Sequence, residues 1–187
     1  MLKPILTLSA FALIAACGST VTRLNMPSVA PTASLRASVG SVMIRTVSLP
    51  TNAATEEIAL ETAPGVITSD GKLLSADDPA RSVTLALTQG VGDILAVNAG
   101  PDPWPFAGLP DVAVDVRVSD MLGSAVTGNF RLAGQYFIGG DGIEYSDQTR
   151  SFSLTVPMAT RDVPGAVAAQ GLAVAQLAED IARQLGR

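Results

Sequence analysis

The protein has 187 residues, of which 12 are Lys or Arg and 17 are Asp or Glu, so its formal net charge is −5. Nucleic-acid binding needs a basic face that neutralises phosphates, and this acidic balance argues against it. Histidine is absent from the sequence, which removes the Ser-His-Asp arrangement and the usual zinc and copper ligand sets.

The first 16 residues, MLKPILTLSAFALIAA, have the build of a secretory signal peptide. Lys3 supplies the positive charge, an apolar run begins at Ile5, and Ala15-Ala16 gives the small-residue exit. The apolar run has 12 residues, whereas a helix that spans a bilayer needs about 20. We therefore predict that residues 1–16 are a cleaved signal peptide rather than a transmembrane anchor.

The only cysteine of the sequence, Cys17, directly follows this segment. The order Ile-Ala-Ala-Cys at 14–17 resembles the bacterial lipobox. The resemblance implies a covalent diacylglycerol on the Cys17 thiol, cleavage before Cys17 and an acyl chain on the new amine. Two or more acyl groups hold a protein stably on a membrane, whereas a single one binds marginally. Gly18 at the next position favours the outer membrane by the same resemblance. The alternative is an ordinary signal peptide with an incidental cysteine.

The mature protein divides into a tether and one folded domain. Residues 17–37 are rich in Ser, Thr, Ala and Pro without a sustained period, which predicts a flexible tether between lipid and domain. Residues 38–187 are enough for a single core. This domain opens with a β-rich run at 39–49, which Pro50 stops.

Two short strands are predicted next, at 56–62 and 66–75, around a tight turn at Asp70-Gly71. Lys72 is the only lysine left after the signal peptide and hence the one candidate for a Ser-Lys dyad. Its position beside the Asp-Gly pair favours the turn over catalysis.

A helix follows, with Asp77 or Asp78 as its cap and Pro79 in its first turn. Apolar residues recur at helical spacing as far as Leu95, although Gly90 and Gly92 weaken the pattern. A loop with four prolines is predicted at 98–111.

The rest of the sequence predicts three longer strands and a closing helix. Alternating apolar residues mark the strands at 112–118, 130–138 and 150–156, and an apolar stripe marks the helix at 162–185, with Asp162 as its cap. The fold class predicted is therefore a single α+β domain, mainly an antiparallel sheet with two main helices packed on one face.

The Pro-rich loop supplies the candidate partner-binding residues, Trp104 and Phe106. Aromatic side chains on a stiff loop suit a partner or lipid contact, since aromatics are frequent interface hot spots. Large aromatics are also usually buried. The favoured alternative is therefore that Trp104 folds back and plugs the edge of the sheet.

Two other groups of polar residues are candidates for sites. Asp141, Glu144 and Asp147 could offer oxygens to calcium, but the segment lacks a repeated Asp-x-Asp pattern and its glycines suit a hairpin loop. The alternating row Asp115, Arg117 and Ser119 could form a surface for subunit contacts, and a solvated sheet face explains it equally well. No metal site is predicted.

The order of elements resembles the PqiC/YmbA family, the auxiliary lipoproteins of ABC-type, MCE-linked transport systems. The resemblance covers essentially the whole sequence and rests on four segments: SVMIRTVSLP at 41–50, VAVDVRVSDM at 112–121, GNFRLAGQYFI at 128–138 and PGAVAAQGLAVAQLAEDIARQL at 164–185.

This resemblance implies a non-enzymatic lipoprotein on the periplasmic face of the outer membrane. Its implied partners are an inner-membrane ABC transporter or permease and an MCE-domain protein that bridges the periplasm and carries phospholipid. The protein would dock or terminate that conduit, alone or as a homo-oligomeric ring, and help to maintain envelope integrity.

Two other functions are compatible with the sequence. Small α+β lipoproteins also serve other envelope assembly or secretion machines. An enzyme that hydrolyses envelope polymers could use paired carboxylates, for which the candidates are Asp77, Asp78, Asp102 and Asp111. No pair among them is singled out by its setting.

Overall fold

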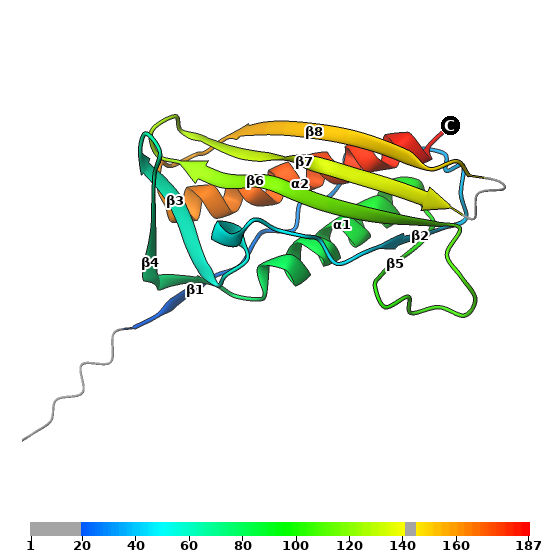
Figure 1. Cartoon of the computed structure of the whole chain (residues 1–187), viewed down its shortest axis with the longest axis horizontal. Helices are drawn as coiled ribbons and strands as arrows, with labels where there is room; N and C mark the ends of the chain where they lie inside the picture. Colours follow the sequence, from blue (N-terminus) through cyan, green and yellow to red (C-terminus); the bar gives the residue numbers. More distant parts are fainter. Residues whose placement is uncertain (1–19, 141–144) are drawn as a thin grey trace, which may run out of the picture.

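Three long strands form one half of the sheet in the computed structural model, which describes residues 20–140 and 145–187. β6 (Val112–Ser124), β7 (Asn129–Gly140) and β8 (Gln148–Pro157) pair antiparallel in that order (Figure 1). The alternate valines of β6 from Val112 to Val118 are buried, whereas Asp115 and Arg117 between them are not. The predicted period-two pattern with one covered face is thus confirmed, and the strands are longer than predicted.

The other side of β6 carries two separate groups of shorter strands. β2 (Ser41–Ile44) pairs parallel with the start of β6 and with β5 (Asn98–Pro101). β3 (Glu57–Ala63) pairs parallel with the end of β6 and antiparallel with β4 (Val66–Ser75), which also pairs with β1 (Thr22–Leu24). β6 therefore joins both groups into one mixed eight-stranded sheet.

Two helices, α1 (Pro79–Leu95) and α2 (Val163–Leu185), pack together on one face of this sheet. The carboxylate of Asp78 accepts a hydrogen bond from Arg81 N at 2.7 Å, and that of Asp162 accepts from Gly165 N at 2.9 Å. Both caps agree with prediction, and each satisfies a backbone N–H that has no partner within its helix. The predicted α+β domain with two helices on one face is confirmed. No helix in the described ranges is long and apolar enough to cross a membrane.

Small side chains bring the two helices close together. A β-carbon on Gly90 of α1 would lie only 2.8 Å from the β-carbon of Ala178 on α2. Gly90 lowers the intrinsic helix propensity, but it permits this close approach. A glycine that weakens the sequence signal for α1 thus serves the packing of α1 against α2.

Residues 25–38, here called the N-terminal strap, pack on the domain instead of forming part of a free tether. Proline and small residues suit an extended segment, and Leu35 N donates to the carbonyl of Ile94 at 2.9 Å. At the far end of the strap, Arg187 N donates to the carbonyl of Arg36 at 2.8 Å. Structure begins before the strap, because β1 is paired at Thr22. The predicted tether at 17–37 is therefore wrong from Thr22 onward.

The predicted turn at Asp70-Gly71 is also wrong. The β3–β4 hairpin turns at Pro64-Gly65, where Gly65 has a φ of +73°, a left-handed conformation that glycine adopts without strain. β4 continues through Asp70-Gly71, where the register with β3 shifts between Glu57 and Ala59. An Asp-Gly pair suits such an irregularity as well as a turn, so composition alone placed the turn too late.

Two predicted boundaries change as well. The opening strand is confined to Ser41–Ile44, but the backbone continues beside β6, with Ser48 N donating to the carbonyl of Val116 at 3.0 Å. The predicted loop at 98–111 begins with strand β5, so the irregular part is confined to 102–111.

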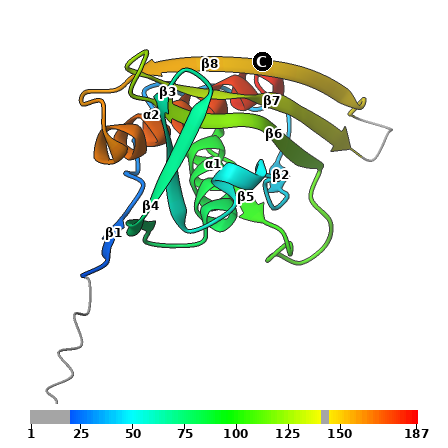
Figure 2. The same ribbon diagram turned by 60° about the vertical axis from the view of Figure 1, so that its left-hand side comes forward.

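The domain is elongated and has two different ends (Figures 1 and 2). The hairpin end comprises β1, the β3–β4 hairpin and the β6–β7 turn, at the left of Figure 1. The loop end comprises residues 102–111 and the C-terminus, at the right of Figure 1. The 13 residues of β6 connect the two ends, a distance of about 43 Å at the usual rise of a strand.

Candidate interaction site

The loop at 102–111 divides its apolar residues between the protein and solvent. Trp104 is partly buried and lies over β5, where a β-carbon on Gly100 would be 3.0 Å from the indole Cζ3. Phe106 meets Trp104 edge to face, with ring centroids 4.9 Å apart, but is itself 46% exposed. Leu109 is 91% exposed. The structure thus places Trp104 back over an edge strand and leaves Phe106 and Leu109 at the surface.

The indole of Trp104 also carries a polar group without a partner. Its Nε1 atom is shielded from solvent and has no hydrogen-bond partner within the described residues. An unsatisfied buried N–H costs about 1–3 kcal/mol. Packing over Gly100 and against the Phe106 ring therefore holds Trp104 in place despite the cost of this donor.

Next to the loop, the sheet face that the helices leave open is hollowed. The hollow has a volume of about 580 Å³. The residues that line it combine apolar side chains, charged side chains and glycines: Met43, Arg45, Leu109, Pro110, Asp111, Ala113, Asp115, Phe137, Gly139 and Gly140. Leu109 belongs to both the loop and the hollow, so the two form one continuous surface.

The predicted polar row lies on this same uncovered face. Arg117 Nη2 is 3.0 Å from Asp115 Oδ2, and its guanidinium lies 5.0 Å from the centre of the Phe137 ring. Hydrogen bonding to Asp115 raises the pKa of Arg117 above its ordinary value, so the side chain stays charged. Ser119 Oγ donates to the carbonyl of Ala133 at 3.2 Å. Arginine and aromatic side chains are enriched at protein–protein interfaces, and here Arg117 lies beside the partly exposed ring of Phe137.

Asp111, one of the candidate catalytic carboxylates, has a structural role instead. Its Oδ2 accepts hydrogen bonds from Gly40 N at 2.6 Å and Ser41 N at 3.1 Å, and its own N–H donates to Ser41 Oγ at 3.0 Å. These bonds fix the end of the loop against the start of β2. The surface formed by Phe106 and Leu109 is thereby held close to the hollow.

The four candidate carboxylates are not assembled into one site. Asp77 and Asp78 lie at the start of α1, where Asp77 pairs with Arg81. Asp102 and Asp111 bound the loop that follows β5. Asp102 N donates to the carbonyl of Ile44, and Asp111 accepts from Gly40 and Ser41, so neither is bonded to the start of α1. The carboxylate enzyme hypothesis thus gains no support from the geometry.

Several predicted site residues lie outside the described residues. These are Cys17 with the whole signal peptide, and Asp141 and Glu144 of the calcium candidate. Asp147 is described and lies 3.6 Å from where a β-carbon on Gly139 would be. Within residues 20–140 and 145–187 there is no group of three or more Asp, Glu, His or Cys that could hold a metal ion.

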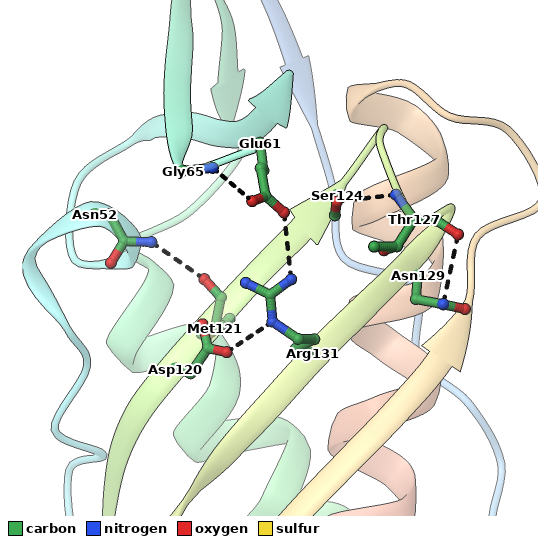
Figure 3. A network of polar contacts seen from close by, with 9 residues as sticks. All are labelled: Asn52, Glu61, Gly65, Asp120, Met121, Ser124, Thr127, Asn129 and Arg131. Atoms are coloured by element: carbon green, nitrogen blue, oxygen red, sulfur yellow. Dashed lines mark hydrogen bonds and ion pairs between the residues drawn. The ribbon is translucent and has the colours of Figure 1, made fainter. Parts of the chain in front are cut away.

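At the hairpin end, a polar network holds the β3–β4 hairpin against β6 and β7 (Figure 3). Arg131 on β7 reaches Asp120 at 2.9 Å and Glu61 on β3 at 3.4 Å. Glu61 also accepts from Gly65 N at 3.1 Å. The Ser124 hydroxyl, the Gly65 N–H and the Arg131 guanidinium lower the pKa of Glu61 below its ordinary value. The hairpin is therefore fixed in position by a charged side chain.

Sequence reasoning missed several exposed apolar residues at both ends. Sequence patterns mark Leu109 only as part of a Pro-rich loop. Val66 and Ile67 follow the Pro64-Gly65 turn and are each 49% exposed. The sequence does contain a signal for this exposure: the Pro-Gly pair predicts a tight turn, and two apolar residues that directly follow such a turn lie at the tip of a hairpin.

Comparison with known proteins identifies a family and a shared fold. The sequence model of the family described as "ABC-type transport auxiliary lipoprotein component" matches residues 23–182. The crystal structure of an uncharacterized protein is 17% identical, with a TM-score of 0.72 over 89% of this protein and 99% of that one. Protein XCC0632 from Xanthomonas campestris, of the DUF330 family, is 12% identical, with a TM-score of 0.70 over 88% and 95%. No curated protein matches.

Proposed function

The protein belongs to the family of ABC-type transport auxiliary lipoprotein components, and we propose that it docks the outer-membrane end of a phospholipid conduit. This family includes PqiC/YmbA-like proteins, so the resemblance drawn from the sequence is confirmed at the level of the family. The protein is thus an auxiliary lipoprotein of an ABC-type transport system. The outer-membrane location, the MCE-domain partner and the phospholipid cargo are the proposed parts.

The family match over residues 23–182 carries this proposal. The lipobox-like order at 14–17 adds the anchor, because a diacylated Cys17 with a third acyl group on its amine would hold the domain stably on a membrane. Gly18 after the cysteine supports the outer membrane. The role is non-catalytic and needs no cofactor beyond the covalent lipid.

The two-ended shape supports a docking role. The proposed anchor precedes β1 at the hairpin end, whereas Phe106, Leu109 and the adjoining hollow lie at the loop end. Since the length of β6 separates the ends by about 43 Å, the exposed aromatic surface is directed away from the bilayer. It is therefore well placed for an MCE-domain protein that spans the periplasm, bound by one subunit or by a homo-oligomeric ring.

A crosslinked pull-down of the membrane-extracted protein with mass spectrometry tests this function. We expect the wild type to recover an MCE-domain protein and a permease or ATPase subunit, and Cys17→Ala to lose or reduce them. Intact-mass analysis of the wild type should show the diacylglycerol and N-acyl additions. Abundant wild-type protein recovered only with components of another envelope assembly or secretion machine would favour that alternative function.

A further inference from the structure

The hairpin end carries a second membrane contact in addition to the lipid anchor. We infer that this end lies on the bilayer that holds the Cys17 lipid, with Val66 and Ile67 inserted into the lipid interface. This inference rests on the proposed acylation of Cys17. It goes beyond that proposal because it assigns a lipid-binding surface to the folded domain and sets the orientation of the domain on the membrane.

The first argument is the short distance along the backbone between the anchor and the fold. Thr22 is five residues after Cys17, and five extended residues reach at most about 18 Å. Thr22 itself is not free, because β1 pairs with β4 at Leu73. Arg23 strengthens this attachment by donating to Glu56 at 2.9 Å and to the carbonyl of Ser75 at 2.8 Å. The hairpin end therefore cannot move far from the bilayer.

The second argument is the distribution of exposed apolar side chains. Val66 and Ile67, each 49% exposed, lie at the tip of the β3–β4 hairpin, and the exposed Val126 belongs to the β6–β7 turn. The hairpin and the turn lie at the same end of the molecule (Figure 2), joined by a 2.9 Å hydrogen bond from Ala125 N to the carbonyl of Glu61. The exposed Val21 directly precedes β1. Apolar groups thus flank β4 at both of its ends.

The third argument is the geometry of β4. Seven residues separate Val66 from Leu73, the partner of Thr22, a span of at most about 23 Å. If β4 lies along the bilayer surface, the anchor holds one end of the strand and the apolar tip inserts at the other. The Arg131 network prevents the hairpin from folding away from this position.

The charges on and around β4 indicate which kind of lipid the hairpin end contacts. Asp70 and Lys72 belong to the strand, and Glu56, Glu57 and Arg23 lie beside it. Such a mixed set does not form a basic patch, and a basic patch is what anionic lipids attract. The contact is therefore apolar, and we expect it on zwitterionic vesicles as well as on anionic ones.

Depth measurements on the full-length lipidated protein in phosphatidylcholine vesicles test this inference. Because the thiol of Cys17 is acylated, Ile67→Cys provides a single site for an environment-sensitive fluorophore. Leu109→Cys at the loop end and Leu172→Cys on α2 are matched controls, since both leucines are exposed. We expect nitroxide-labelled lipids to quench the Ile67 label strongly and iodide to quench it several-fold less than the controls. Adding phosphatidylglycerol should not change the result.

The outcomes separate this inference from the proposed function. Failure of the wild type to float with vesicles would overturn both, because no anchor would exist. Flotation with an Ile67 label as accessible to iodide as the Leu109 label would overturn only the lipid contact. A fluorophore on Val66→Cys, compared in the presence and absence of Ile67→Asp, isolates the contribution of the apolar Ile67 side chain to membrane insertion. The aspartate should reduce lipid quenching, and unchanged quenching would mean that the anchor alone sets the depth, contrary to the inference.

Discussion

The carbonyl oxygen of Pro27 lies directly over Gly171 of α2, 2.5 Å from the position that a β-carbon on that glycine would take. The N-terminal strap here crosses a groove between the two helices, and the groove is lined by small residues such as Gly90 and Ala178. Interiors are packed closely enough that one added methyl group is felt. The route of the backbone from the anchor to the domain thus depends on the missing side chain of Gly171.

Gly171→Val should displace the strap. The added side chain overlaps Pro27, and overpacking of this kind typically costs about 1–3 kcal/mol of the free energy of unfolding. We expect faster amide hydrogen exchange at residues 25–38, while the amides of β6 and β7 stay protected. Leu172→Val is the matched control, because that side chain is exposed on the next position of the helix. Unchanged exchange of the strap in Gly171→Val would contradict the packing described here.

Gly134→Ala should destabilise the central sheet. A β-carbon there would overlap the carbonyl oxygen of Arg117 and lie 2.9 Å from Val118 Cα and 3.0 Å from Phe152 Cζ. The overlap falls beside the register shift between Val118 and Asp120, where β6 comes close to β7. We expect a loss of about 3 kcal/mol in urea unfolding, since backbone atoms cannot move aside as a flexible side chain would.

Gly139→Ala on the same strand is the control for this substitution. The nearest atom to a β-carbon there is Asp147 Oδ1 at 3.6 Å, an ordinary contact distance. We expect its unfolding midpoint to stay close to that of the wild type. Equal losses in the two variants would mean that glycine is needed along β7 for a reason other than close strand approach.

The stability of the hairpin end should depend on pH through Glu61. The Ser124 hydroxyl, the Gly65 N–H and Arg131 lower its pKa in the folded state. A carboxylate with a lowered folded pKa adds stability above its unfolded pKa, and that stability is lost as the pH falls through the folded value. The loss should therefore begin below about pH 4, near the ordinary pKa of glutamate.

Glu61→Gln keeps the shape of the side chain but removes the charge. We expect the variant to melt below the wild type at pH 7 and the two melting temperatures to converge as the pH falls below about 4. Thermal unfolding followed by circular dichroism between pH 3 and pH 7 measures this. A constant difference across that range would show that the charge of Glu61 contributes nothing beyond its hydrogen bonds.

Much of the fold could be predicted from local patterns. The alternate valines of β6 and the capped helices carry their signal in neighbouring residues, and both were predicted correctly. The strap and the β3–β4 turn were not, because their structure depends on distant partners. The residues next to Pro27 in the sequence do not predict that it packs against Gly171. Likewise, the residues around Asp70-Gly71 do not predict that this pair lies in a strand paired with β1 and β3.

The candidate surface was predictable only in part. Trp104 and Phe106 were found from an aromatic pair between prolines, with Trp104 favoured to fold back over the sheet edge, but sequence could not show why Trp104 rather than Phe106 would do so. That choice depends on Gly100, whose missing side chain leaves room for the indole on β5. Met43 and Arg45 belong to one segment and Phe137 to another that is distant in sequence, and only the pairing of β2 with β6 and of β6 with β7 brings them to one hollow.

Phe106→Ser combined with Leu109→Ser should weaken partner binding without unfolding the domain. Both side chains are exposed and lie at the loop end, so their removal costs little core packing. Truncation of an interface anchor typically costs at least about 1 kcal/mol, so two anchors together should weaken binding roughly tenfold or more. The measurement is the yield of the crosslinked MCE-domain partner relative to the lipidated protein recovered. Leu172→Ser, an exposed leucine on α2, should leave that yield unchanged. If the double variant keeps the full yield while Leu172→Ser lowers it, the docking surface lies on the helices and not on the loop.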